Sequence, residues 1–172
     1  KEFSLEAGRP DSITPRKLKI AKEMGVSRIS VNPQTMNNET LELIGRRHTA
    51  EDIERAYSMA RDAGFDNINM DIIAGLPGEE ISHFEYTLNK ISQMRPDGLT
   101  VHTLSVKRAA DLKQDAKIEM LKHEITGKML LQSQKTAADM GMHPFYMYRQ
   151  KNMLGNHENV SYCRPGCESP YN

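Results

Sequence analysis

The sequence lacks a surplus of charge of either sign and lacks any long apolar run. Its 172 residues include 23 Lys and Arg against 23 Asp and Glu, so the formal net charge is zero. A protein without a basic surplus has little electrostatic attraction for nucleic acid. A chain without about 20 consecutive apolar residues has no candidate membrane span. We therefore expect neither nucleic acid nor a membrane as a partner.

Cysteine is also scarce. Its two occurrences, Cys163 and Cys167, lie near the end of the sequence, so the chain has no disulfide framework. Such cysteine usage favours a reducing compartment, and we expect a cytoplasmic protein. With His157 upstream, the two thiols can also be read as part of a metal site, but these ligands are few and loosely spaced. Free cysteines are the favoured interpretation.

The hydrophobic content of 38% is sufficient for a packed core, and the length suits one domain or part of a larger one. The sequence shows no signal peptide and does not begin with methionine. Its first residues lead almost directly into the strand-like segment Phe3–Glu6. We therefore expect the chain to start within a domain.

Strand-like and helix-like segments alternate along the sequence. Five segments have the composition of strands: Phe3–Glu6, Arg28–Gln34, residues 67–74, Leu99–Leu104 and Phe145–Arg149. Helical patterns follow the caps at Thr14 and Thr49, cover Asn37–Ile44, and recur around residues 81–91 and 118–140. This alternation predicts right-handed crossovers and an α/β fold with a parallel sheet of about five strands.

Two segments have no such pattern. Lys107–Ala116 is charged and poor in apolar residues, so we expect a mobile loop there. From Gln150 onward the chain is rich in Gly, Asn and Pro without periodicity, so residues 150–172 are expected to be irregular.

The segment Asn67–Glu79 organises the rest of the sequence. It is a β-rich run that carries Asp71 and ends in the turn Gly75-Leu76-Pro77-Gly78. In β/α proteins, ligands bind at the turn that leaves the carboxyl end of a strand. Glycines there permit close approach of the backbone, and a carboxylate accepts hydrogen bonds from both hydroxyls of a ribose. The alternative is a buried strand whose Asp71 merely caps the next helix.

The other expected strands also end in polar side chains. These strand-end residues are Glu6, Gln34, Asp71, His102 or Thr103, and Tyr148 with Arg149. Because the carboxyl ends of parallel strands share one rim, we expect a single site for a ligand with hydroxyls, an amine and a carboxylate. Each residue taken alone can equally be a solvated strand end. The sequence contains no Walker, zinc-protease or Ser-His-Asp pattern, and its glycines do not match a dinucleotide fingerprint.

Several segments resemble the radical S-adenosylmethionine (SAM) family, most closely its oxygen-independent coproporphyrinogen oxidase group, in the dehydrogenase branch. The resemblance rests on five segments: Glu6–Asp11, Val31–Gln34, Ile44–His48, Asp71–Gly78 and Tyr146–Asn156. It implies that residues 1–149 are the C-terminal part of a partial (β/α)6 barrel, with family strands three to six and a following strand. Residues 150–172 would lead into a further region.

The resemblance also implies roles for individual residues. Those expected to contact SAM are Glu6, Gln34, Arg46 at its carboxylate, Asp71 at its ribose, and Ile73, Gly75 and Ser105 around its adenine. Charge and rim position add a hypothesis that Arg149 and Lys151 pair with substrate propionates.

One feature of the family is absent. The Cys-x-x-x-Cys-x-x-Cys motif that ligates its [4Fe–4S] cluster does not occur in the sequence. We therefore interpret the chain as a fragment that is inactive by itself. Its parent would decarboxylate coproporphyrinogen III propionates to vinyl groups in haem biosynthesis, with an electron donor that the sequence does not identify.

Two other functions remain open. A haem chaperone of the same superfamily would use the scaffold to carry haem, although the segment Tyr148–Asn152 favours the dehydrogenase branch. An unrelated β/α-barrel lyase would act without SAM. We also expect self-association through an exposed edge of the sheet.

Overall fold

The computed structural model describes residues 3–105, 116–149 and 157–169, with side chains from residue 123 onward in the last helix. Its strands are β1 (Ser4–Gly8), β2 (Arg28–Gln34), β3 (Ile68–Ala74), β4 (Gly98–Thr103), β5 (His143–Tyr148) and β6 (Asn159–Cys163). Its helices are the short 3-10 turn η1 (Pro10–Ser12), α1 (Pro15–Glu23), α2 (Asn38–Leu43), α3 (Ala50–Asp62), α4 (Ile81–Met94) and α5 (Ala116–Asp139).

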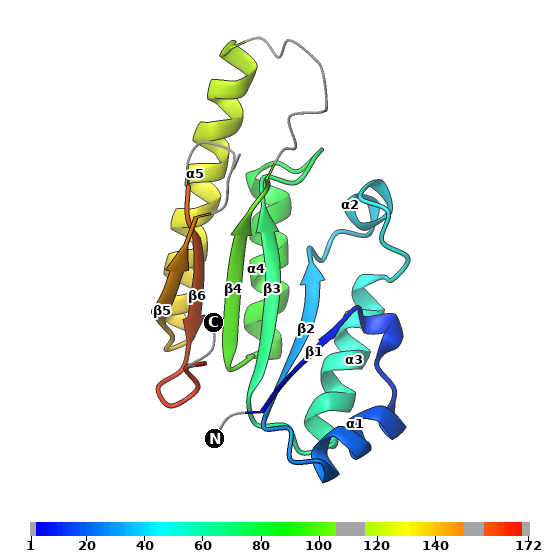
Figure 1. Ribbon diagram of the computed structural model, residues 1–172. Helices are drawn as coiled ribbons and strands as arrows, with labels where there is room; N and C mark the ends of the chain where they lie inside the picture. Colours follow the sequence, from blue (N-terminus) through cyan, green and yellow to red (C-terminus); the bar gives the residue numbers. More distant parts are fainter. Residues whose placement is uncertain (1–2, 106–115, 150–156, 170–172) are drawn as a thin grey trace.

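The strands form one mixed sheet in the order β1-β2-β3-β4-β6-β5 (Figure 1). The first four strands are parallel, whereas β6 is antiparallel to both of its neighbours. β5 therefore runs in the same direction as β4 although it does not pair with it. The predicted α/β fold is confirmed, and the sheet differs from the predicted five parallel strands by the insertion of the antiparallel β6.

The expectation of an irregular segment after Gln150 is wrong for Asn159–Cys163, which form β6. This strand has five residues, too few for its alternation to stand out beside the Gly- and Pro-rich neighbours. It is held by pairing with β4 on one side and β5 on the other, and this long-range contact is not visible in the local sequence. The expected loop Lys107–Ala116 lies outside the described residues, except for Ala116, which begins α5.

The helix starts agree with the cap residues in the sequence. The Thr14 side chain accepts a hydrogen bond from the backbone of Lys17, and Pro15 occupies the first turn of α1. Thr49 and Asp52 form a reciprocal capping box at the start of α3. These local contacts satisfy backbone donors that the helices leave free, so the positions of α1 and α3 along the chain are encoded locally.

The helices pack against one face of the sheet, and α3, α4 and α5 lie behind it in Figure 1. The core strand residues are fully buried: Ile29, Val31, Ile68, Met70, Ile72, Leu99 and Val101. Helix residues that complete this core include Ile53, Ala56, Phe84, Leu88 and Ile91. Since strand side chains alternate between faces, residues between these positions point to the opposite side of the sheet.

Within the described part of the chain, no helix combines the length and the apolar character needed to cross a bilayer.

The outer side of β1 is an edge of the sheet that pairs with no strand of the described residues. Phe3 and Leu5 expose 49% and 37% of their surface beside it. We predict that the chain self-associates through this edge, because unpaired strands with apolar side chains accept a further strand. Sedimentation over a range of concentrations should show association that Leu5→Lys weakens. Met24→Lys, at the exposed apolar residue that caps the C-terminus of α1, is the control. A monomeric wild type, or equal behaviour of both variants, would contradict the prediction.

Candidate functional site

The face of the sheet opposite the helices is polar. Along β2, Arg28 and Ser30 alternate with buried apolar residues, and along β3 Asn69 and Asp71 do the same. Parallel strands covered by helices on both faces are apolar on both. The alternation here therefore marks a face adapted to a polar interior or ligand, as inside a β/α barrel.

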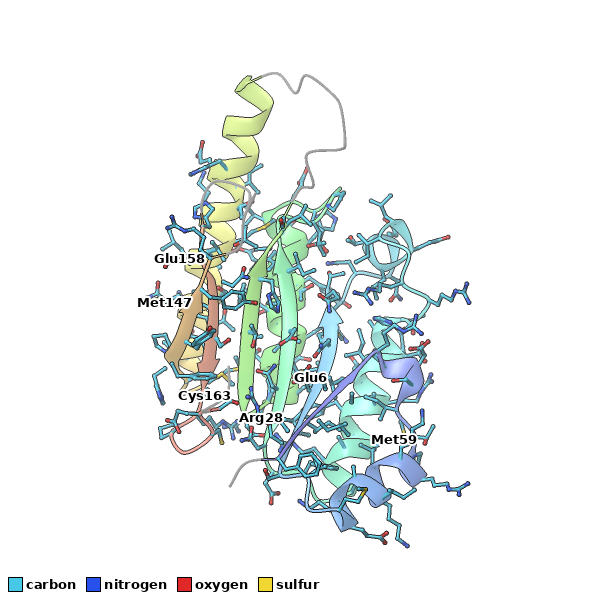
Figure 2. All side chains as sticks on the ribbon, viewed as in Figure 1. Glu6, Arg28, Met59, Met147, Glu158 and Cys163 are labelled. Carbon is cyan, nitrogen blue, oxygen red and sulfur yellow. The ribbon has the colours of Figure 1, made fainter. Side chains whose placement is uncertain are left out.

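A cavity of about 310 Å³ lies on this polar face. Its lining residues come from all six strands: Glu6, Arg28, Asn69, Asp71, Thr100, His102, Tyr146, Tyr148 and Ser161. Figure 2 shows Glu6 on β1 and Arg28 on β2 near this face. The volume is at the lower end of the range for small-molecule sites. The cavity is thus large enough for a nucleoside-sized ligand.

Asp71 lies at the centre of the hydrogen bonds in the cavity. Asn69 Nδ2 donates to Asp71 Oδ1 at 2.7 Å, and His102 Nε2 lies 3.8 Å from Asp71 Oδ2. His102 Nδ1 shares a hydrogen bond of 3.0 Å with the Tyr148 hydroxyl. Burial, together with the negative charge of Asp71, raises the pKa of Tyr148, so the phenol stays protonated at neutral pH. These contacts orient the Asp71 carboxylate, and part of it remains exposed to the cavity.

A second set of hydrogen bonds orients Asn69. Thr100 Oγ1 donates to Asn69 Oδ1 at 3.2 Å, and Ser161 Oγ donates to Thr100 Oγ1 at 3.3 Å. Because its oxygen accepts from Thr100, the Asn69 amide nitrogen faces Asp71. Gly98 provides the space for this arrangement, since a Cβ there would lie 2.9 Å from Asn69 Oδ1. A chain of side chains from three neighbouring strands thus holds the carboxylate.

Gln34 ends β2 in an unusual backbone conformation. Its φ of 68° lies in the left-handed region, which side chains other than glycine rarely adopt. The pairing register shifts at the same place, because Val31 opposes Met70 whereas Gln34 opposes Ile72. A bulge of this kind redirects a side chain at a strand end, and such local strain concentrates at functional sites.

A buried network supports the two loops that follow β2 and β3. Glu79, only 9% exposed, accepts hydrogen bonds from the Thr35 hydroxyl and from Asn37 Nδ2. Thr87 of α4 accepts from the backbone of Met36 at 3.0 Å. These contacts tie the chain after Gln34 to the turn after β3. Within that turn Gly75 and Gly78 have φ of 85° and 79°, a conformation suited to glycine.

The structure brings together part of the set expected from the sequence. Glu6 and Asp71 line the same cavity, and Ser30 Oγ donates to Glu6 Oε1 at 3.2 Å. Ile73 lies on the same face, two residues nearer the strand end than Asp71. Gln34 lies at this end of the sheet. Neither Gln34 nor Ile73 is among the described residues that line the cavity.

The remaining SAM-contact residues of the predicted set lie on the loops beyond the strands. Arg46 follows α2 and is half-buried, whereas its neighbour Arg47 is exposed. His48 beside them is only 3% exposed, and burial lowers its pKa, so it stays neutral at pH 7. Ser105 lies just past the end of β4. None of these loop residues is part of the cavity lining within the described chain.

The proposed substrate-binding residues are only partly described. Arg149, just after β5, is exposed and forms an ion pair of 3.2 Å with Glu158. Lys151 lies outside the described residues.

Several cavity residues were missed by sequence reasoning, which considered only strand ends: Arg28, Asn69, Thr100, Tyr146 and Ser161. The alternation of polar and apolar residues along β2 and β3 would have identified Arg28 and Asn69. Arg28 is only 5% exposed, and its Nε has no hydrogen-bond partner among the described residues.

The described residues do not fit a [4Fe–4S] cluster. Such clusters need cysteine thiolates, and a three-cysteine motif is absent from the sequence. Cys163 pairs with Gly98 at the beginning of β4, which is the end of the sheet opposite Gln34 (Figure 2). Burial raises the pKa of Cys163 to about 11, so its free thiol is protonated.

Comparison with known proteins places these observations in a family context. Residues 2–91 match the model of the family described as the radical SAM superfamily. The oxygen-independent coproporphyrinogen-III oxidase-like protein HemZ of Bacillus subtilis is 45% identical over the whole chain. The haem chaperone HemW of the same organism is 31% identical over 99% of it. The chain spans 34% and 42% of the lengths of these two relatives.

A solved structure shares the fold. The coproporphyrinogen III oxidase HemN of Escherichia coli superposes with a TM-score of 0.72 at 23% sequence identity. The match covers 96% of this chain and 36% of that one. It supports the interpretation of the sheet as part of a radical SAM barrel.

The left-handed backbone at Gln34 predicts an unusual order of stability. Gln34→Gly should be more stable than Gln34→Ala by roughly 1 kcal/mol, since only glycine adopts this φ without steric cost. Urea unfolding of the two variants measures the difference. The matched pair Gln132→Gly and Gln132→Ala, within helix α5, should show the reverse order. If alanine is the more stable residue at both positions, the prediction fails.

Proposed function

The chain belongs to the radical SAM superfamily, and we propose that its polar face binds the nucleoside half of SAM in an enzyme that oxidises a coproporphyrinogen-type tetrapyrrole. The observation that carries the proposal is the Asp71 carboxylate, held by Asn69 in a cavity that also contains Glu6. The 45% identity to a relative named coproporphyrinogen-III oxidase-like supports the substrate class.

Asp71 is suited to a ribose. One of its oxygens accepts from Asn69, and its side chain is 16% exposed, so acceptor positions remain available on the cavity side. A carboxylate can accept hydrogen bonds from the 2′ and 3′ hydroxyls together. Preorganisation matters here, because a carboxylate fixed before binding loses little conformational entropy when the sugar arrives.

The other proposed contacts rest on membership of the family rather than on the cavity lining, which of these residues contains only Glu6 among the described residues. Glu6 would bind the amine of SAM through its carboxylate, and Arg46 would bind the carboxylate through its guanidinium. Gln34 would hydrogen-bond SAM between its amine and its carboxylate. The adenine would pack against Ile73 and the turn at Gly75, with Ser105 near its polar edge. The left-handed backbone of Gln34 supports this assignment.

When bound, SAM supplies the radical chemistry of the family, and the protein contributes binding, orientation and exclusion of water. The three-cysteine ligand set of the cluster that cooperates with SAM does not occur in this sequence. Because the chain spans about a third of its relative HemZ, we propose that the remaining parts of the active site are supplied by sequence beyond it.

The substrate would be recognised by its propionates. Arg149 lies at the end of β5, on the same end of the sheet as Gln34, and its guanidinium is exposed. Guanidinium groups bind carboxylates in a bidentate manner. Glu158 occupies Arg149 in this structure, so a propionate would exchange with this surface carboxylate. We propose that Lys151 contributes a second cation.

Carriage of haem without oxidation is the second candidate function. The relative HemW, named as a haem chaperone, matches 99% of the chain at 31% identity. The two functions differ in their requirements, since carriage needs specific haem affinity whereas oxidation needs SAM consumption with each substrate. Tight haem binding without SAM-dependent decarboxylation would favour the chaperone.

We predict that Asp71→Asn weakens SAM binding about tenfold or more, because the variant loses a charge-assisted hydrogen bond to the ribose. Calorimetric titration of SAM into the full-length, cluster-loaded protein measures the affinity. Asp62→Asn, an exposed residue at the end of α3, is the matched control and should bind normally. Wild-type affinity in Asp71→Asn would overturn the assignment of this site.

We predict that Arg149→Ala raises the KM for coproporphyrinogen III at least about tenfold while SAM affinity is unchanged, because a guanidinium–carboxylate contact is lost. Initial rates of carbon dioxide release under anaerobic conditions measure it. The control is Glu158→Gln, which frees Arg149 and should not raise the KM. An unchanged KM in Arg149→Ala would remove this residue from substrate binding.

A further inference from the structure

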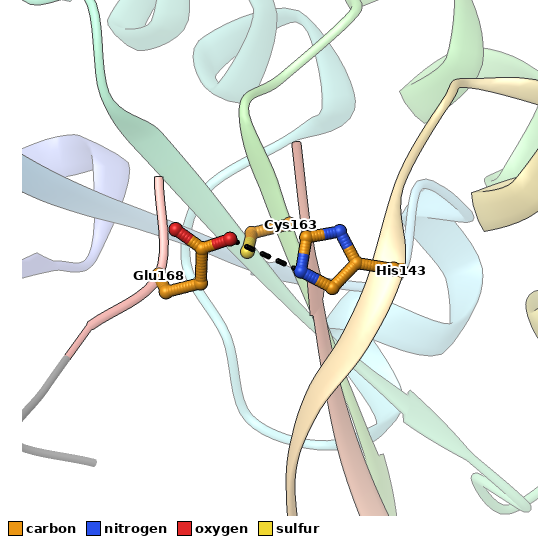
Figure 3. Close-up of side chains that lie close together, drawn as sticks. All are labelled: His143, Cys163 and Glu168. Atoms are coloured by element: carbon orange, nitrogen blue, oxygen red, sulfur yellow. Dashed lines mark ion pairs between the residues drawn. The ribbon is translucent and has the colours of Figure 1, made fainter. Parts of the chain in front are cut away.

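A second group of functional side chains lies at the end of the sheet where β4 begins. Antiparallel pairing places His143, the first residue of β5, opposite Cys163, the last residue of β6. Directly opposed residues of an antiparallel pair project from the same face as neighbours. Backbone pairing therefore brings an imidazole and a thiol together (Figure 3).

The chain after β6 adds a carboxylate. A turn in which the Cys167 backbone donates to Arg164 O at 3.0 Å brings Glu168 back towards the sheet. Glu168 Oε1 lies 3.1 Å from His143 Nε2. The turn is itself anchored, because the Arg164 backbone donates to Asp97 O at 2.9 Å. Three separate segments thus converge, and each is fixed by backbone hydrogen bonds.

We propose that His143, Cys163 and Glu168 form a zinc site. The candidate ligand atoms of these residues all lie within 4.8 Å of one another. Zinc binds imidazole nitrogen, thiolate sulfur and carboxylate oxygen at about 2.0–2.3 Å, so tetrahedral ligand atoms lie within about 4 Å of each other. The imidazole and carboxylate already satisfy this spacing, and a small movement of the thiol completes it.

The combination of imidazole, thiolate and carboxylate ligands favours zinc over Mg²⁺ and Ca²⁺. A thiolate disfavours Mg²⁺ and Ca²⁺, which take oxygen ligands, whereas zinc accepts all three donor types. One thiolate and one carboxylate also neutralise the charge of a divalent ion at a partly buried position. Three protein ligands leave the fourth tetrahedral position to a solvent molecule.

Exposure allows an ion to enter. Cys163 is fully buried, whereas the His143 and Glu168 side chains are 45% and 43% exposed. The thiol therefore lies at the base of the site, and the other two ligands lie on its solvent side. The protonated state of the free thiol is no obstacle, because a coordinating metal ion deprotonates it.

A bound ion would join β5, β6 and the segment after β6 in one crosslink. Its effect is therefore structural, and its three ligands are distinct from the residues assigned to SAM. The competing interpretation is a plain surface ion pair between His143 and Glu168, with Cys163 as an ordinary buried thiol. That interpretation predicts no metal uptake.

Competition for Zn²⁺ with a chromophoric chelator, using the reduced, metal-free 172-residue chain, tests the proposal. We expect one zinc ion per chain. His143→Gln and Glu168→Gln should each weaken binding at least about tenfold, and Cys163→Ser should weaken it further. Cys167→Ser is the matched cysteine control and should bind like the wild type.

Two further measurements distinguish the loss of a zinc ligand from the loss of folding in a variant. Co²⁺ in place of zinc should give a thiolate-to-metal absorption band that Cys163→Ser loses. Zn²⁺ should raise the melting temperature of the wild type but not that of His143→Gln, whose side chain is exposed enough for the variant to fold. The proposal is overturned if the wild type takes up no stoichiometric zinc, if His143→Gln keeps full affinity, or if Cys167→Ser loses it.

Discussion

The alternation of apolar and polar residues along the central strands is the constraint on which the rest of the structure depends. At Ile29, Val31, Met70 and Ile72 the apolar side chains pack against helices and build the core. No helix of the described residues covers the residues between them. A parallel sheet with one uncovered polar face is stable only where that face meets solvent, a ligand or the interior of a barrel. The same periodicity therefore specifies both the core and the cavity.

The polar face is ordered because its side chains hydrogen-bond across strands. Asn69 links Asp71 on its own strand to Thr100 on the next, and Gly98 leaves the space that the amide occupies. Buried polar groups are costly when unpaired but rigid when satisfied. The carboxylate is therefore held in place before any ligand arrives, whereas the buried Nε of Arg28 has no hydrogen-bond partner among the described residues.

The sequence predicted the elements whose signals are local. The strand Arg28–Gln34 has the expected bounds, and the caps at Thr14 and Thr49 begin the expected helices. The strand Asn159–Cys163 could not be found in this way, because its five residues are stabilised by two partners distant in sequence. For the site, strand ends predicted that Glu6 and Asp71 lie together. The backbone conformation of Gln34 has no local signature, because it results from a register shift between two strands.

The direction of β6 positions residues of both proposed sites. Because β6 runs against β4, its last residue, Cys163, lies beside Gly98 at the beginning of that strand. A parallel β6 would have placed the same thiol at the end that holds Gln34 and the loops after the strands. The antiparallel insertion also places Ser161 opposite Thr100, where it supports the hydrogen bonds that reach Asp71. One five-residue strand therefore supports the nucleoside site through Ser161 and supplies the buried ligand of the zinc site from its last residue, Cys163.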